Sequence, residues 1–429
     1  MQKKLLGLAV AGALAAPGIA LAQVEVYGFV NMSVGQVKYD SVSPNAGQAT
    51  AVSSVTKMDV ASHASNYGIR GRENIGMGQT AWFQIEQNAP MERSNNVAIT
   101  PASRNSAVGV QGNWGNLFIG QWTTPWADLD ALWAVGSVGG WTPVTSVIGR
   151  RETTGTAPNA NCANGGHGLA TSCDAVEAGS GVGHAFWRRT SQSIFYQSPV
   201  FAGVQVKLSY QTNEGKASPE AGVPNANAQM WSSSVQWAGM GGRVRVGAAF
   251  DSHKDFSTIG KTDTGWRVTG GWNFGVVDVG FAYEQMTYAL STSGTGAQGA
   301  TYSGNDCEAK QYGLGVAVPV GQGAIRGSWA VAKDLDGTGC NVVIGSPAGA
   351  GFGGATTWTL GYDYRFSKRT TIGAGYATID NKSGDATNPG GVHAWTGLPP
   401  NQSGAGSVAN GPLPGGDVST FFVNMIHRF

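Results

Sequence analysis

The sequence has few charged residues: they make up 12% of its 429 positions, about half the usual share. The formal net charge of +1 shows no excess of basic residues of the kind that binds nucleic acid. Beyond the N-terminus no run reaches the roughly 18 apolar residues of a membrane-spanning helix, which excludes a helical membrane protein. Glycine is abundant instead, with 66 residues, about twice the usual share.

The N-terminus has the organisation of a secretory signal peptide. Lys3 and Lys4 precede an apolar run over 5–16, and a Pro17-Gly18 break is followed by the small-residue site 20–22. A membrane anchor is disfavoured because the run is short, rich in Ala and Gly, and broken by Pro17. We therefore expect a signal peptide over residues 1–22 and an exported chain over 23–429.

The exported chain alternates between apolar and polar residues with a period of two. In the segment TTWTLGYDYRFS, Trp358, Leu360 and Tyr362 share one parity, while Asp363 and Arg365 share the other. The same division recurs over 204–210, 243–250 and 266–274. Period-two alternation predicts strands with one apolar face, but a soluble sandwich would show it as well.

The connections between these strands alternate between short and long. Short turns are expected near 74–78, 113–116, 199–203, 239–242, 275–277, 319–323 and 367–369. Long polar stretches are expected near 39–61, 91–102, 123–188, 213–226, 255–263, 289–306, 335–355 and 381–416. Seven short and eight long connections join sixteen strands, which predicts an all-β, 16-stranded antiparallel transmembrane barrel. Aromatic residues at strand ends are expected to form its interfacial girdles: Tyr27, Trp82, Tyr196, Trp237, Tyr283 and Tyr376.

The last strand, DVSTFFVNMIHRF, ends in phenylalanine. Phe421, Val423, Met425, His427 and Phe429 share one parity. This pattern resembles the C-terminal strand that outer-membrane proteins present to their assembly machinery. We therefore interpret Phe429 as an assembly signal, and His427 as an interfacial anchor.

These stretches together resemble the general porins of Gram-negative outer membranes. The likeness runs through VYG at 26–28, SNYGIRGRENIGMGQTAWFQIE, SRNSAVGVQGNWGNLFIGQW, RRTSQSIFYQSPVFAGVQVKLSY and the terminal Phe429. The resemblance implies a homotrimer in a bilayer with lipopolysaccharide, with short periplasmic turns, long extracellular loops and a third loop folded into the lumen. It implies passive diffusion of ions and small hydrophilic solutes, with no cofactor, metal or catalytic residue.

By this resemblance the third loop spans 123–188 and narrows the pore. Its acidic residues would face basic residues on the opposite wall, and the family's four basic positions map to Phe29, Asn66, Arg104 and Arg189, so two are lost. Another basic position of the family is Gln121 here. Arg70 and Arg72 face the lumen by parity and could compensate. We expect the constriction to be lined by Asp128, Asp130, Arg70, Arg72, Arg104 and Arg189, and the lumen by Arg243, Arg245, Arg267, Arg326 and Arg365.

Because these arginines outnumber the loop carboxylates, we expect a weak preference for anions; the alternative is that many of them hold loops in place. The loop region also contains Trp122, Trp126, Trp133 and Trp141. These tryptophans either favour sugar-like organic solutes or pack the loop against the wall, and packing is the stronger interpretation.

The four cysteines fit an oxidising compartment. Cys162 and Cys173 lie in one loop, and the hairpin between the predicted twelfth and thirteenth strands brings Cys307 and Cys340 to the same side. Of the three possible pairings we favour these two. A metal site at Cys162, His167 and Cys173 lacks the paired spacing of zinc sites.

Two other classes of function remain open. A barrel enzyme of the lipase or protease type would need a nucleophile beside a base, yet the six histidines show no GxSxG or HExxH grouping. A surface adhesin would rest on the long loops alone.

Overall fold

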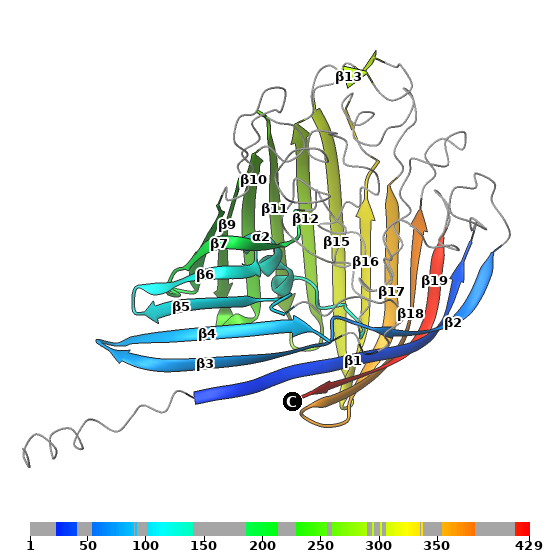
Figure 1. Ribbon diagram of the computed structural model, residues 1–429. Coiled ribbons are helices and arrows are strands. Elements are labelled where there is room, and N and C mark those ends of the chain that lie inside the picture. The colour runs from blue at the N-terminus through cyan, green and yellow to red at the C-terminus, as the bar shows by residue number, and fades with distance from the viewer. Residues whose placement is uncertain are drawn as a thin grey trace, which may run out of the picture.

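The structure is a computed structural model that describes residues 23–40, 54–89, 91, 101–139, 186–212, 229–254, 260–289, 294–295, 301–302, 306–334, 336–337, 354–381 and 417–429. Its strands stand side by side around a barrel (Figure 1). The first and last are β1 (Gln23–Tyr39) and β19 (Val418–Arg428), and they pair antiparallel from Phe29–Arg428 to Tyr39–Val418. This pairing closes the sheet, so the barrel has no free edge strand.

Seventeen strands form this sheet, but two of them share one place in the wall. The C-terminal half of β1 pairs with β2 (Val55–Ser62), and its N-terminal half pairs with β3 (Asn66–Gly76). The break between β2 and β3 includes Ala64, a non-glycine residue with a φ of 53°. Counted as one wall strand, β2 and β3 give the sixteen positions that the sequence predicts, and the fold prediction is confirmed.

The other wall strands follow in chain order, each antiparallel to the next. They are β4 (Gln79–Asn88), β5 (Ser106–Gly112), β6 (Gly115–Thr123), β7 (Arg189–Gln197), β8 (Val204–Gln211), β9 (Gln229–Gly239), β10 (Val244–Lys254), β11 (Thr262–Asn273), β12 (Asp278–Ala289), β15 (Asp306–Val320), β16 (Gly323–Ala332), β17 (Ala355–Arg365) and β18 (Thr370–Asn381). A separate ribbon pairs β13 (Gly294–Thr295) with β14 (Thr301–Tyr302). The helical segments are α2 (Pro125–Asp128), η1 (Leu129–Leu132) and η2 (Met240–Gly242), and none in the described ranges is long and apolar enough to cross a membrane.

All seven short turns lie where the sequence predicts them. Glycine supplies the left-handed backbone that several of them require, as at Gly78, with a φ of 71°, and Gly275, with a φ of 93°. The two ends of the described chain, at Gln23 and Phe429, lie on the same side as these turns.

Alternation along each strand separates an apolar outer face from an inner face. On β17, Leu360 is 53% exposed on the outside, whereas Thr357 and Thr359 are buried on the inside. Tyr196, Trp237, Tyr283 and Tyr376 are directly opposite other outward-facing residues, as the girdle prediction requires.

Tyr27 and Trp82 correct the girdle prediction, because both belong to the inner face. The Tyr27 hydroxyl donates to Glu86 across the sheet, at 2.9 Å, and Trp82 contacts the buried ring of Phe118. An aromatic residue near a strand end therefore does not by itself indicate the lipid-facing side, because aromatic rings also occur on the inner wall.

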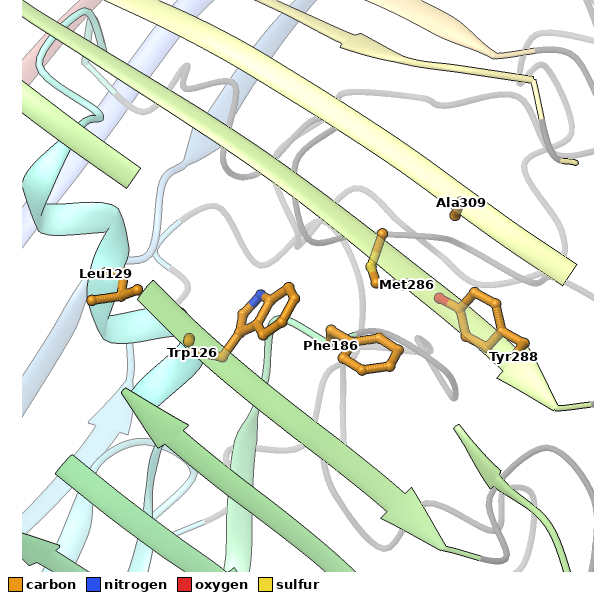
Figure 2. Close-up of a cluster of buried hydrophobic side chains, with 7 residues drawn as sticks. Trp126, Leu129, Phe186, Met286, Tyr288 and Ala309 are labelled. Carbon is orange, nitrogen blue, oxygen red and sulfur yellow. The ribbon is translucent and has the colours of Figure 1, made fainter. Parts of the chain in front are cut away.

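Three clusters of buried apolar side chains lie inside the barrel, each with a residue from the segment after β6. The first contains Trp126, Leu129, Phe186, Ala249, Met286, Tyr288 and Ala309 (Figure 2). The second includes Val138 beside Val37 and Phe422, and the third is built around Trp133. The core is therefore the contact between this segment and the barrel wall.

Candidate functional site: the third loop and the inner wall

The third loop enters the barrel through a short capped helix. Thr124 accepts a hydrogen bond from the backbone N–H of Ala127, and Pro125 occupies the first turn, where its missing N–H costs nothing. Helix α2 then leads directly into η1. Trp126 points towards Phe186 (Figure 2), whereas Leu129 lies over Gly247 of β10.

The described part of the loop, up to Gly139, lies on wall positions that have no side chain. A Cβ on Gly265 would lie 2.6 Å from the Phe186 ring, and one on Gly361 would lie 2.7 Å from Val138. The glycines beneath the loop and its returning end are Gly247, Gly265, Gly271, Gly280, Gly313, Gly315 and Gly361. Glycine therefore lets the loop backbone approach the strands more closely than any other residue would.

Arg267 of β11 holds the start of the loop. Its side chain is fully buried, one Nη donates to the Trp126 carbonyl at 3.0 Å, and the other binds the Asp130 carboxylate. Its Nε lies 3.5 Å from Glu284, which is also fully buried. A buried cation between two carboxylates and a carbonyl links the loop to two wall strands.

Asp130 accepts two further hydrogen bonds in this anchor. The indole N–H of Trp133 donates to one carboxylate oxygen at 3.2 Å, and that of Trp187 donates to the other. Trp187 belongs to the end of the loop that returns to β7. Asp130 therefore joins the entering and returning parts of the loop.

Two other predicted lumen arginines bind loop carbonyl groups further along. Arg245 donates to the Leu132 carbonyl at 3.2 Å and pairs with Asp278 at 2.7 Å. Arg326 donates to the Val135 carbonyl and pairs with Asp363 at 3.1 Å. Each arginine thus has a wall carboxylate that fixes its orientation and neutralises its charge.

Asp128, the first loop carboxylate, lies 3.0 Å from the Lys207 ammonium of β8. Burial raises the pKa of Asp128, and the neighbouring ammonium opposes that rise. Asp128 and Asp130 therefore both pair with the wall against which the loop packs.

The basic residues of β3 and β7, and Arg104 just before β5, have other partners. Arg104 pairs with Glu86 at 2.6 Å, and Arg189 donates to the Asn105 side chain at 2.7 Å. Arg70 pairs with Glu25 at 2.9 Å, and the same carboxylate also feels the charge of Arg72. Two guanidinium groups thus share one carboxylate at this place.

Arg243 and Arg365 are exposed at the short-turn end of β10 and β17, away from the loop. They share the inner parity of the anchoring arginines, but their height along the strand differs. Phe29 and Asn66 occupy two positions that are basic in the family, and neither carries a charge here. Phe29 is half-buried and Asn66 is buried.

Trp126 and Trp133 are fully buried, so they cannot contact a solute in this conformation. The packing interpretation of these two tryptophans therefore fits the structure better than solute contact. Trp122 instead joins Trp82, Phe118 and Phe195 in an aromatic group on the inner wall, with ring centroids 4.9–5.9 Å apart. Trp141 lies outside the described residues.

The disulfide prediction is untested, since Cys162, Cys173 and Cys340 lie outside the described residues and the Cys307 side chain is not described.

Phe429 exchanges two backbone hydrogen bonds with Gly28, at 3.1 and 3.3 Å, and so completes the seam of the barrel. Within the described ranges no group of three His, Cys, Asp or Glu residues could hold a metal ion.

Sequence reasoning missed the partners of the arginines. Glu284, Asp278 and Asp363 all lie on inner-face positions and are recognisable by parity alone, as is Lys207, the partner of Asp128. The count that predicted an excess of lumen arginines included only the loop carboxylates. The wall carboxylates reduce that excess.

Comparison with known proteins agrees with this geometry. The family model described as Gram-negative porin matches residues 7–384. The major outer membrane protein P.IB of Neisseria meningitidis serogroup A is 24% identical over 259 residues, which are 60% of this chain and 62% of that protein. A P.IB protein of Neisseria gonorrhoeae is 30% identical over 155 residues, 35% of this chain and 42% of that protein. The chain therefore matches less than two thirds of the length of these relatives.

Solved structures show the same fold. The anion-selective porin from Comamonas acidovorans superposes with a TM-score of 0.62 at 20% identity, over 95% of this chain and all of that one. OmpT of Vibrio cholerae, in its trimer form, superposes with a TM-score of 0.54 at 14% identity, over 95% of this chain and 99% of that one. With the family match covering most of the sequence, the chain belongs to the Gram-negative porins, a family of outer-membrane proteins.

Proposed function

We propose that this chain forms a water-filled pore through which ions and small hydrophilic solutes diffuse passively across the outer membrane. The observation that carries the proposal is the anchoring of the third loop inside a closed barrel by Arg267 and Asp130. The described ends of the loop, held against the inner wall in this way, narrow the channel. Selectivity then depends on the remaining opening and on the charges around it.

The charge pattern supports a weak preference for anions. Most lumen arginines have a carboxylate partner, so the net positive charge is small. It is concentrated where Arg70 pairs with Glu25 and the charge of Arg72 also acts on that carboxylate. A similar fold occurs in a porin described as anion-selective. We infer that chloride crosses more readily than potassium, by a small factor.

Single-channel recording in planar bilayers tests both parts of this proposal. With potassium chloride on both sides we expect long, steady openings, and under a salt gradient a reversal potential of the sign that chloride produces. A protein that folds and inserts but never conducts would contradict the pore. A reversal potential of the opposite sign would contradict only the anion preference.

We further propose that three copies assemble, each with its own pore. Support comes from the trimer form of OmpT, whose fold resembles this one. The expected result is a trimeric mass by light scattering in detergent, after correction for bound detergent. A monomeric mass for protein that retains conductance would contradict the trimer.

A barrel enzyme is the alternative function, and one contact in the structure resembles a catalytic pair. The Ser33 hydroxyl lies 2.6 Å from Nε2 of His63, the arrangement of a nucleophile with its base. Both side chains are buried, at 6% and 3% exposure, so a substrate could not reach the hydroxyl. We therefore favour a structural bond here and a pore for the whole chain.

A further inference from the structure

The most exposed apolar side chains of the described chain lie on its short turns. Among large apolar residues, the five highest exposed fractions belong to Met77 at 93%, Phe201 at 83%, Val276 at 76%, Met240 at 71% and Phe366 at 70%. Each belongs to a different short turn. Of the two remaining short turns, one carries Trp114, 38% exposed, and the other directly follows Val320, the last residue of β15, which is 43% exposed. Each of the seven turns thus carries or directly adjoins an exposed apolar side chain, a pattern that scattered surface residues would not produce.

Two of these residues occupy a backbone conformation that disfavours them. Met77 has a φ of 50° and Met240 a φ of 52°, and each stands between glycines in a Gly-Met-Gly sequence. Glycine or asparagine adopts this left-handed conformation at lower cost. Ala202, in a third short turn, has a similar φ of 50°, so the backbone alone does not require a long apolar side chain there, and the choice of methionine at 77 and 240 needs another explanation.

The same end of the barrel is basic. Lys368 and Arg369 are exposed within the turn after β17, while Arg243, Arg365 and Arg428 are exposed at strand ends with inner parity; Glu73 is an exposed acid at the same end. Apolar side chains beside Lys and Arg are typical of surfaces that bind the interface of a membrane with anionic lipids.

The apolar surface also continues onto the outer wall. Ile75 adjoins the turn that carries Met77, and Phe274 adjoins the turn that carries Val276; both are 49% exposed. The turns therefore extend the lipid-facing band beyond the strand ends.

We propose that the seven short turns form an apolar collar, defined by Met77, Trp114, Phe201, Met240, Val276, Val320 and Phe366, that lies in the headgroup region of the adjacent leaflet. The adjacent basic side chains bind the phosphates of anionic phospholipids. Lys368 and Arg369, next to Phe366, are the clearest such pair. The inference rests on the outer-membrane placement of the barrel and is independent of what passes through the pore.

Methyl NMR of the full chain in lipid nanodiscs tests the collar. The methionine methyl groups are labelled with ¹³C, and signals are assigned with M77L and M240L. Nanodiscs of phosphatidylethanolamine and phosphatidylglycerol carry either a doxyl-labelled lipid or a gadolinium chelate in the water. We expect the doxyl lipid to broaden the Met77 and Met240 signals severalfold more than the chelate does. Stronger broadening by the aqueous chelate would overturn the proposal.

Three other methionines serve as internal references for the measurement. Met58, 68% exposed on the outer face of β2, should respond to the doxyl lipid, and the buried Met230 and Met286 should respond weakly to both probes. In a variant with F366M, the new methyl group lies in the same turn as Lys368 and Arg369, and its broadening should increase when phosphatidylglycerol is added. If the increase persists after K368Q and R369Q are added, these basic side chains do not bind the anionic lipid.

A stability measurement separates the collar from turns that stand in water. Asparagine suits the left-handed backbone, so M77N with M240N should raise the urea midpoint in vesicles if the turns are hydrated. The collar predicts a lower midpoint, because the apolar contacts are lost. Unchanged single-channel conductance of this variant would show that the pore is intact, which separates a failure of the collar from a failure of the proposed function.

Discussion

Removing Arg267 tests whether the third loop is held by its buried charges. In an R267M variant the volume of the side chain is largely kept, but Asp130 and Glu284 lose their cation and the Trp126 carbonyl loses its donor. Glu284 is fully buried and Asp130 is only 16% exposed, so neither carboxylate is well solvated by water. The loop must then either retain unpaired charges or leave the wall.

The magnitude follows from these contacts. Removing one partner of a buried ion pair costs about 3–5 kcal/mol. Asp130 keeps the two indole donors, so we take the lower end, about 3 kcal/mol, which is roughly a hundredfold change in the equilibrium between held and released loop. Single-channel recordings should show frequent brief closures and a wider spread of conductance than the parent protein does.

Two variants make this result specific. R365M removes an exposed arginine of the same parity at the end of β17 and should leave the openings steady. Adding D130N and E284Q to R267M removes the uncompensated charges and should restore much of the steadiness. If R267M alone conducts as steadily as the parent, the buried ion pairs do not hold the loop and our reasoning is wrong.

Three further predictions concern the loop and the wall beneath it. G280A places a methyl group against the Trp133 backbone and should disturb the channel openings. G327A is the control, because its new Cβ would be 3.5 Å from its nearest neighbour, and its openings should stay steady. Equal recordings for the two variants would contradict the close approach of loop and wall. Because burial raises the pKa of Asp128, acidification should neutralise this carboxylate before an ordinary one and leave the Lys207 ammonium uncompensated. The anion preference measured by reversal potentials should therefore rise as the pH falls. D128N should remove this part of the pH dependence, and an unchanged dependence would exclude Asp128 as its source. W126A should lower stability by about 3–5 kcal/mol in urea unfolding without selectively reducing flux of neutral sugars, and a selective loss of sugar flux in a stable variant would favour solute contact.

Strand positions and turns could be predicted because they depend on local chemistry. The period-two alternation and the glycines of the short turns specify where the chain is extended and where it reverses. The third loop was also predicted, through the family resemblance. One strand position is wrong: β2 (Val55–Ser62) lies within the long connection expected near 39–61. Its charged residues Lys57 and Asp59 make the segment resemble the polar stretch before it, although Met58 and Val60 alternate with them.

Side-chain roles were harder to predict because parity gives a face and not a height. Arg267 and Arg365 both have inner parity, yet one is fully buried under the loop and the other is exposed at a turn. The difference depends on the path of the loop across the strands, which is a tertiary property. Partner carboxylates such as Glu284 and Asp363 became meaningful only once that path was known.

The path of the loop is nevertheless recorded in the sequence, in its glycines. Gly247, Gly280 and Gly313 lie on the inner face of β10, β12 and β15, where a strand in a stable sheet would normally carry a side chain. Glycine weakens each of these strands, so it is explained only by a neighbour that needs the space. The loop is that neighbour, since Leu132 and Trp133 occupy the space above these positions. Part of the high glycine content is thus a consequence of placing a second layer of backbone inside the barrel.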